Sequence, residues 1–323
     1  MTRVFVTHPT SRLLQYYGPR ATAALQAVAE VKFNPGDTDL SSRQIAALAQ
    51  DCEIIVSYRQ TVGDEALFAA LPGLKAFVRC AIDIRNIDVA AATRHGVLVT
   101  QASAGFIASV AEWVIGVMVD LSRNISLSTR QYQSGGTGVS AMGRELKGST
   151  LGVIGYGQIS RYLCDVALAL GMRVVVHDPY ARTGREGVVP AALEELLRQA
   201  DYLVCLATAT AETEDLMNAR TFALMKPGAF FINPSRGNLV DDDALLQALD
   251  SGHLAGCAVD VGRAPDQMPS PRVAAHPRVI ATPHIGGLTP PAIEHQAMET
   301  VAQVSEIIKG RVPKGAVNQP HAK

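Results

Sequence analysis

Two side chains in the second half of the sequence could act together on a carbonyl group that lies next to a carboxylate. Arg236 follows an apolar run at 229–235, and a guanidinium can hold a carboxylate through two parallel hydrogen bonds. His284 follows another apolar run at 278–283, and an imidazole can donate or accept a proton near neutral pH. In an open parallel sheet, ligands bind where the strands end. We therefore expect both side chains to meet one substrate at that edge.

A glycine-rich turn lies between a strand-like run and a helical pattern, at Gly155-Tyr156-Gly157-Gln158-Ile159-Ser160. The first glycine allows a tight turn, and the second lets backbone N–H groups approach a pyrophosphate at the start of the helix. Asp178, 23 residues after Gly155, ends the next apolar run and can accept hydrogen bonds from the ribose hydroxyls of an adenosine. Its charge would repel a 2′-phosphate, which favours NAD over NADP, although Arg182 and Arg185 follow closely.

These residues need a frame of parallel strands, and apolar runs alternate with helical patterns along nearly the whole chain. The alternation predicts an α/β fold with right-handed crossovers. The expected strands are 3–7, 53–58, 75–79, 96–100, 150–155, 173–178, 202–207, 229–235, 256–262 and 278–283. The expected helices include 21–29, 42–49, 107–122 and 290–309.

The pattern also predicts two domains separated by a cleft. Residues 1–99 and a returning tail, 291–323, would form the substrate domain, and residues 100–290 would form an inserted NAD domain. The stretch 131–148 is rich in glycine and polar residues, and we expect it to leave the compact part of the second domain. Closure of the two domains would exclude water from the reacting groups.

Composition and charge exclude several classes of protein. The chain has 323 residues, of which 48% are hydrophobic and 18% charged, so it can bury a large core and is not disordered. A net charge of −1 gives no basis for binding nucleic acid. The five cysteines form no close pair, no signal peptide is evident, and the apolar stretch 110–121 is too short to cross a bilayer. We expect a cytoplasmic protein with no disulfide, metal, membrane or nucleic-acid partner.

Five motifs follow one another in order. They are Ser109-Val-Ala-Glu112, Gly155–Ser160, Asn233-Pro-Ser-Arg236-Gly-Asn-Leu-Val-Asp241, Ala258-Val-Asp260-Val and Thr282-Pro-His284-Ile-Gly-Gly. From about Lys75 onward the sequence resembles the D-isomer-specific 2-hydroxyacid dehydrogenase family, and is similar to glyoxylate/hydroxypyruvate reductases and phosphoglycerate dehydrogenases. No regulatory domain is expected, since 39 residues follow His284. The resemblance implies two Rossmann-like, doubly wound parallel-sheet domains and hydride transfer between NAD(H) and a small 2-hydroxy or 2-keto acid.

The resemblance also implies roles for individual residues. Arg236 would anchor the substrate carboxylate, His284 would be the acid and base, and Asp260 would hold the nicotinamide carboxamide. The helix from Ser109 would pack against a second subunit to give a homodimer, unless its apolar residues are buried within one chain. The complete cofactor-binding set would be Gly155, Tyr156, Gly157, Gln158, Ile159, Asp178, Ala207, Thr208, Pro234, Ser235, Arg236, Asp260, His284 and Gly286.

One departure from the family concerns the partner of the catalytic histidine. The family carries a Glu five residues after the position of Asp260, where it pairs with that histidine, but this chain has Pro265 there. Asp266 is the nearest carboxylate. We hypothesise that Asp266 supports the protonation of His284. The alternative is a solvated loop aspartate.

A second departure lies in the substrate loop, Ala81-Ile82-Asp83, whose counterpart in the family binds the substrate carboxylate through backbone N–H groups. Asp83 replaces a glycine there, and its charge would repel an anionic substrate unless it is paired. Either Arg79 or Arg85 neutralises it within the loop, or Asp83 contacts a hydroxyl or amine of the substrate.

Two other functions have to be weighed against an enzyme of this kind. The family resemblance also covers NAD-sensing, corepressor-like binding proteins with little catalytic activity, and the altered loop and the missing Glu favour that alternative. Turnover of any keto acid would exclude it. Formate oxidation ranks last, because no matching asparagine or glutamine pair is present.

Overall fold

The computed structural model describes residues 1–138, 140–264 and 266–320, and it divides them into two compact units. The first unit comprises Met1–Phe106 and the described residues from Thr289 onward, and the second comprises Ile107–Leu288. The first boundary falls where helix α6 (Ile107–Arg123) begins, and the second falls just before helix α13 (Pro290–Ile308). The sequence placed these boundaries at 99/100 and 290/291.

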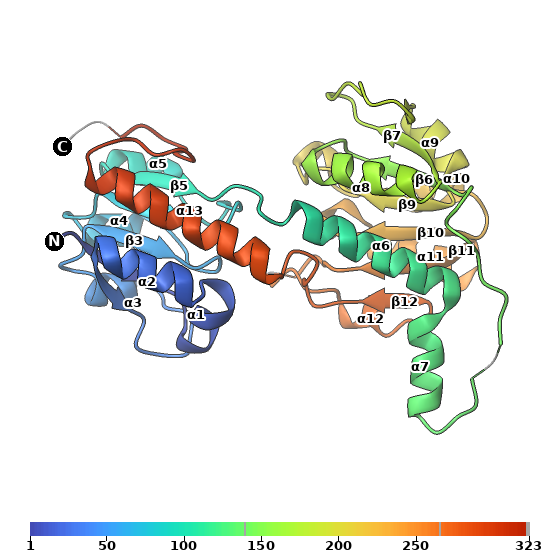
Figure 1. Cartoon of the computed structure of the whole chain (residues 1–323), viewed down its shortest axis with the longest axis horizontal. Helices are drawn as coiled ribbons and strands as arrows, with labels where there is room; N and C mark the ends of the chain where they lie inside the picture. Colours follow the sequence, from blue (N-terminus) through green and yellow to red (C-terminus); the bar gives the residue numbers. More distant parts are fainter. Residues whose placement is uncertain (139, 265, 321–323) are drawn as a thin grey trace. The chain divides into compact units, whose positions relative to one another are not determined.

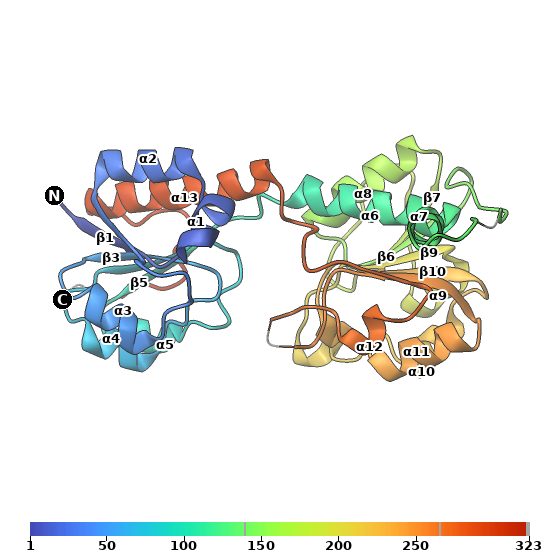
Figure 2. The same cartoon turned by 90° about the horizontal axis from the view of Figure 1, so that it is seen from below.

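The first unit is built around a parallel sheet, which in the described residues has five strands in the order β2-β1-β3-β4-β5. These strands are β1 (Arg3–Val6), β2 (Glu30–Phe33), β3 (Ile54–Ser57), β4 (Ala76–Arg79) and β5 (Leu98–Gln101). Helices α2 (Pro19–Val28) and α13 cover one face, whereas α3 (Ser42–Leu48), α4 (Glu65–Ala70) and α5 (Val89–Arg94) cover the other (Figure 2). Helix α1 (Thr10–Tyr16) follows β1.

Both faces of this sheet are buried, which explains its continuous apolar runs. In β1, Val4 and Val6 pack with residues of α2 and α13, while Phe5 packs with residues of α3 and α4 on the opposite face. Successive side chains of a strand point to opposite faces, so a strand covered on both sides needs apolar residues throughout.

The second unit is also a parallel sheet, with seven strands in the described residues and the order β12-β11-β10-β9-β6-β7-β8. The strands are β6 (Thr150–Ile154), β7 (Arg173–His177), β8 (Val188–Pro190), β9 (Tyr202–Cys205), β10 (Ala229–Asn233), β11 (Leu254–Val259) and β12 (Val279–Ala281). From β6 the chain first adds β7 and β8 on one side, and then returns to add β9 to β12 on the other side. The strand order therefore reverses between β6 and β9. This is the position at which open α/β sheets bind ligands.

Helices cover both faces of the second sheet (Figures 1 and 2). Helices α6 and α8 (Gln158–Ala169) pack on one face. The other face carries α9 (Leu193–Gln199), α10 (Ala219–Leu224), α11 (Asp242–Asp250) and α12 (Pro271–Ala274). The remaining helices of this unit are α7 (Ile125–Gln133) and the short 3₁₀ turns η1 (Ala211–Thr213) and η2 (Gly237–Leu239).

Each of the ten strands predicted from the sequence overlaps a strand of the structure. Strands β2 and β8 were missed. Both lie at a sheet edge, where one side of the strand has no neighbour, and most of their side chains are half-buried or exposed. Helix α7 was also missed. Beyond it, the described residues 134–138 and 140–149 contain no helix or strand. Among the described residues, no helix combines the length and apolarity that a bilayer crossing requires.

Candidate active site

The predicted site residues of the second unit all follow the carboxyl ends of its strands. The glycine turn follows β6, Asp178 follows β7, and Ala207 and Thr208 follow β9. Pro234–Arg236 follow β10, Asp260 follows β11, and His284 and Gly286 follow β12. Because all neighbouring strands are parallel, these ends share one edge of the sheet. The structure therefore brings the predicted residues to a single edge.

Backbone geometry explains the two glycines of the turn after β6. Gly155 has φ +89°, and a Cβ at this position would lie 2.7 Å from the carbonyl oxygen of Leu206. Any other residue would be strained there and would collide with the start of the neighbouring loop. At Gly157, in contrast, a Cβ would meet no atom within 4 Å. Gly155 thus shapes the turn, while Gly157 leaves open space beside it.

That open space lies at the N-terminus of α8. Gly157 is the N-cap residue of this helix, and no side chain of the described residues caps it. The first N–H groups of a helix have no partner within the helix, and they carry a partial positive charge. Open space next to uncapped N–H groups fits the pyrophosphate of a dinucleotide.

Asp178 completes this nucleotide-binding edge. One carboxylate oxygen accepts the Tyr156 N–H at 2.7 Å, and the other accepts the N–H groups of Tyr180 and Ala181 at 2.8 and 2.9 Å. Burial favours the neutral form, but these three donors outweigh it and hold the pKa of Asp178 below its usual value. A carboxylate has about four acceptor positions, so one is left for a ribose hydroxyl. Arg185 is directed away to Asp165 of α8, at 2.6 Å.

The loop that carries Arg236 is fixed by a buried side chain, Asn233. Its amide donates to the Arg236 carbonyl at 2.9 Å, and its oxygen accepts the Ser235 N–H at 3.0 Å. The Ser235 hydroxyl donates to the Ala207 carbonyl at 2.8 Å, which ties this loop to the one after β9. A Cβ on Gly237 would overlap the backbone of Gly262, so the loops after β10 and β11 also pack in direct contact.

Asp260 holds the loop that carries His284. Its side chain is 2% exposed, and it accepts hydrogen bonds from the Thr282 hydroxyl at 2.6 Å, the Ile285 N–H at 2.8 Å and the Gly286 N–H at 2.7 Å. These donors lie on both sides of His284, whose φ of +54° is in the left-handed region. Such a conformation persists only where its surroundings enforce it. The hydrogen bonds to Asp260 hold the backbone on both sides of His284 in this conformation. The contact of Asp260 with the nicotinamide carboxamide stays a prediction.

Helix α6 packs against the same loop. A Cβ on Gly286 would lie 2.9 Å from a carboxylate oxygen of Asp260 and 3.6 Å from the Trp113 ring. A larger residue at 286 would therefore push against both. A carboxylate and an indole ring both lie close to this point of the loop.

Asp266 is exposed, and one of its carboxylate oxygens accepts the Met268 N–H at 3.0 Å. The surrounding turn is closed by hydrogen bonds from Gln267 N–H to the Ala264 carbonyl and from Gly262 N–H to the Gln267 carbonyl. Pro265, which stands where the family has a Glu, lies outside the described residues. The pairing of Asp266 with His284 stays a prediction.

The predicted substrate loop, Ala81–Asp83, belongs to the first unit and follows β4. Asp83 accepts hydrogen bonds from the backbone N–H of Arg85 and from its guanidinium, at 2.7–3.1 Å. Arg85 is thus the partner that balances Asp83 within the loop. A contact between Asp83 and a substrate hydroxyl or amine stays a prediction.

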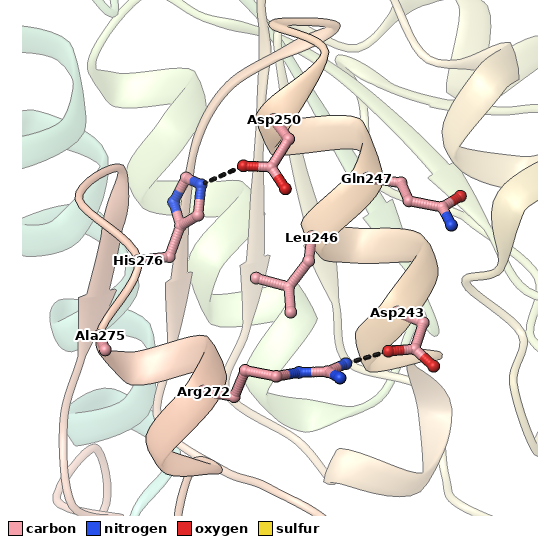
Figure 3. Close-up of a pocket in the computed structure, with 7 residues that line it drawn as sticks. All are labelled: Asp243, Leu246, Gln247, Asp250, Arg272, Ala275 and His276. Carbon is pink, nitrogen blue, oxygen red and sulfur yellow. Dashed lines mark hydrogen bonds and ion pairs between the residues drawn. The ribbon is translucent and has the colours of Figure 1, made fainter.

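A pocket of about 530 Å³ lies elsewhere, between α11 and α12 (Figure 3). Its charged side chains pair with one another: Asp250 lies 3.2 Å from His276, and Arg272 bonds to Asp243. None of the predicted site residues lines it. This pocket is therefore not the candidate site.

Comparison with known proteins identifies the family. Residues 115–286, more than half of the chain, match the NAD-binding domain of D-isomer-specific 2-hydroxyacid dehydrogenases. The chain belongs to the D-isomer-specific 2-hydroxyacid dehydrogenase family, and its second unit contains the family's NAD-binding domain.

Individual relatives agree with this assignment. The D-3-phosphoglycerate dehydrogenase of Bacillus subtilis (strain 168) is 36% identical over 264 residues, which cover 79% of this chain and 49% of that protein. The chain spans about half the length of the curated relatives it matches. D-lactate dehydrogenase from Aquifex aeolicus, complexed with NAD and lactic acid, has a TM-score of 0.78 at 26% identity over 96% of each chain. A structure from Polaromonas sp. JS6 66, provisionally assigned to the same family, has a TM-score of 0.91 at 25% identity, over 98% of this chain and 100% of that one.

Sequence reasoning missed the residues that position the predicted ones. Asn233, Gly237 and Thr282 stand within the motifs, but the motifs alone indicate no role for them. The sequence does hint at the role of Asn233, because an Asn side chain in a turn often accepts a hydrogen bond from the backbone N–H two residues later. No local signal marks Thr282 or Gly237, because their partners lie on other strands.

Proposed function

We propose that this protein is an NAD-dependent dehydrogenase that interconverts a small 2-keto acid and the corresponding D-2-hydroxy acid. The observation that carries the proposal is the edge of the second sheet. There a glycine turn and Asp178 fit a dinucleotide, and the loops of Arg236 and His284 are locked by buried partners. Reduction of a carbonyl next to a carboxylate requires a cation to hold the carboxylate and an acid to protonate the oxygen, both held in a fixed position.

In this proposal each residue has one task. Arg236 anchors the substrate carboxylate through its planar fork, and the N–H groups of Ala81–Asp83 bind the same anionic group. His284 donates a proton to the carbonyl oxygen during reduction and takes one from the hydroxyl during oxidation. NADH, when bound, supplies the hydride. Asn233 and Asp260 hold the backbone of the loops that carry these two residues.

The test is a screen of NADH oxidation, followed at its absorbance band, with glyoxylate, hydroxypyruvate, phosphohydroxypyruvate and longer 2-keto acids. We expect turnover with at least one of them and a weaker response to NADPH. The variant His284→Gln should lose kcat by about 100-fold or more while still binding NADH. Arg236→Gln should mainly raise the KM of the keto acid. Binding of NADH without any turnover across the series would refute the proposal in favour of a dinucleotide-sensing protein.

We also propose a homodimer, and we place its contact surface on helix α7, because the apolar residues of α6 follow the alternative expectation of burial within one chain. Val114, Val117, Met118 and Leu121 of α6 are buried in the core of their own unit. Helix α7 has no buried residue, and the apolar side chains exposed on it and beyond it include Ile125, Leu127, Tyr132 and Met142. A second copy could cover this surface. Light scattering after size exclusion should give a dimer, and Leu127→Ser with Tyr132→Ser should give a monomer. A cytoplasmic location stays a prediction.

A further inference from the structure

The largest side chain that is completely buried among the described residues belongs to Arg79. It ends β4, immediately before the loop that contains Ala81–Asp83. Removing a cation from water costs several kcal/mol unless good hydrogen bonds compensate. An apolar side chain such as methionine could occupy much of this space without that cost. The burial of Arg79 therefore points to a task beyond filling the core.

Arg79 joins two loops through its guanidinium. It donates to the carbonyl oxygens of Tyr58 and Thr61, the latter at 2.7 Å, and to the side-chain oxygen of Asn86 at 2.7 Å. Asn86 in turn donates to the carbonyls of Arg59 at 3.3 Å and Thr61 at 3.2 Å. We call this pair the Arg79–Asn86 clamp. It fastens residues 58–61, after β3, to residues 80–86, after β4.

The clamp fixes both ends of the substrate loop. Arg79 stands directly before the loop, and Asn86 ends it, where the Asn86 carbonyl also accepts the Gly63 N–H at 3.0 Å. Between these ends the loop has no helix or strand in the described residues, and Asp83 is paired with Arg85. Backbone hydrogen bonds from Ala102 to Ala81 and from Ile87 to Ile84 also hold the loop, and the clamp adds the buried side-chain contacts at its two ends.

The charge of Arg79 also acts on this loop. Burial lowers the pKa of Arg79 to about 10, and the charge of Asp83 counteracts part of that shift, so the guanidinium is ionised at neutral pH. Arg85 and Asp83 cancel each other. The cation of Arg79 therefore leaves the loop with a net positive charge, whereas without it the loop would be neutral.

We propose that Arg79, assisted by Asn86, is a positioning residue for substrate binding: it fixes the backbone of Ala81–Asp83 and supplies the positive charge that lets a carboxylate approach beside Asp83. Arg79 acts through the loop and does not contact the substrate, since its side chain is fully buried. The inference rests on the proposed function, in which this loop binds the carboxylate of a 2-keto acid.

The test compares Arg79→Met, which removes the charge and all donors, with Arg79→Lys, which keeps the charge but loses the fork. The KM of the best keto acid should rise at least about tenfold in Arg79→Met, as expected for lost hydrogen bonds to a charged group, and less in Arg79→Lys. The KM of NADH should stay within about twofold, because nucleotide binding is assigned to the second unit. Arg94→Met, which removes an exposed guanidinium on α5, is the control and should leave both values unchanged.

A second change separates positioning from a merely structural role. Adding Asp83→Asn to Arg79→Met removes the carboxylate that neutralises Arg85, so the loop regains a net positive charge and the KM of the keto acid should fall again. If Arg79→Met does not fold, Asn86→Ala opens the clamp while keeping the cation, and it should raise the same KM. Wild-type KM values in a folded variant, or no recovery with Asp83→Asn, would overturn the inference. A wild type that reduces no keto acid would refute the proposed function itself, and this inference with it.

Discussion

The hydrogen bonds of Asp260 give a quantitative prediction about catalysis. The variant Asp260→Asn replaces one acceptor oxygen by an NH₂ group, which cannot accept the N–H of Ile285 or Gly286. One hydrogen bond to a charged acceptor, worth about 1.5–3 kcal/mol, is lost, and a buried N–H is left without an acceptor. The left-handed conformation of His284 costs about 1–3 kcal/mol. Without that compensation for the strain, the wild-type conformation should become a minor state of the variant's loop.

We therefore expect kcat to fall about 10- to 100-fold, since each 1.4 kcal/mol corresponds to a factor of about ten. Urea unfolding followed by circular dichroism should show a loss of about 2–4 kcal/mol in the free energy of unfolding. The control is Asp250→Asn, whose carboxylate is exposed beside His276 and should contribute less than about 1 kcal/mol. A folded Asp260→Asn enzyme with wild-type kcat would show that the His284 loop does not need this carboxylate.

Three further perturbations test other parts of the structure. Gly155→Ala should lower the free energy of unfolding by about 1–3 kcal/mol because residue 155 has a positive φ. Gly157→Ala should change the free energy of unfolding by less than about 0.5 kcal/mol, but it should weaken NADH binding, measured by titration calorimetry. Asp178→Ala should raise the ratio of NADPH to NADH activity, and an unchanged ratio would contradict the assigned role. Burial, aided by the charge of Arg79, lowers the pKa of His8 from 6.5 to about 3. The unfolded chain binds that proton near pH 6.5 and the folded one does not, so stability should decline by about 1.4 kcal/mol per pH unit below 6.5. His8→Phe should flatten this slope in urea titrations.

Most of the strands that carry the site were predictable because they are buried on both faces and read as unbroken apolar runs, and the edge strand β12 is also an apolar run, Val279–Ala281. Strand β2, with the sequence Glu30-Val-Lys-Phe33, lacks such a run because it lies at an edge. Residues directly after strands, such as Arg236 and His284, could be placed at the sheet edge from sequence order alone. The topology of a parallel sheet is enough to bring them together.

The contacts that hold those residues could not be predicted in the same way. Asp260 and Gly286 are 26 positions apart, and their hydrogen bond exists only because β11 and β12 are neighbours. The burial of Arg79 depends on carbonyl groups contributed by the loop after a different strand. Local patterns predict elements and their order, whereas positioning contacts arise from tertiary packing.

The ring that packs against Gly286 belongs to the one tryptophan of the chain, Trp113. Its fluorescence therefore comes from a single place, beside the loop of the proposed acid–base residue. Ligands that settle on this loop should alter the intensity or wavelength of that emission, so their affinities could be titrated without a label or turnover. The wild-type protein thus contains its own optical reporter beside the proposed active site.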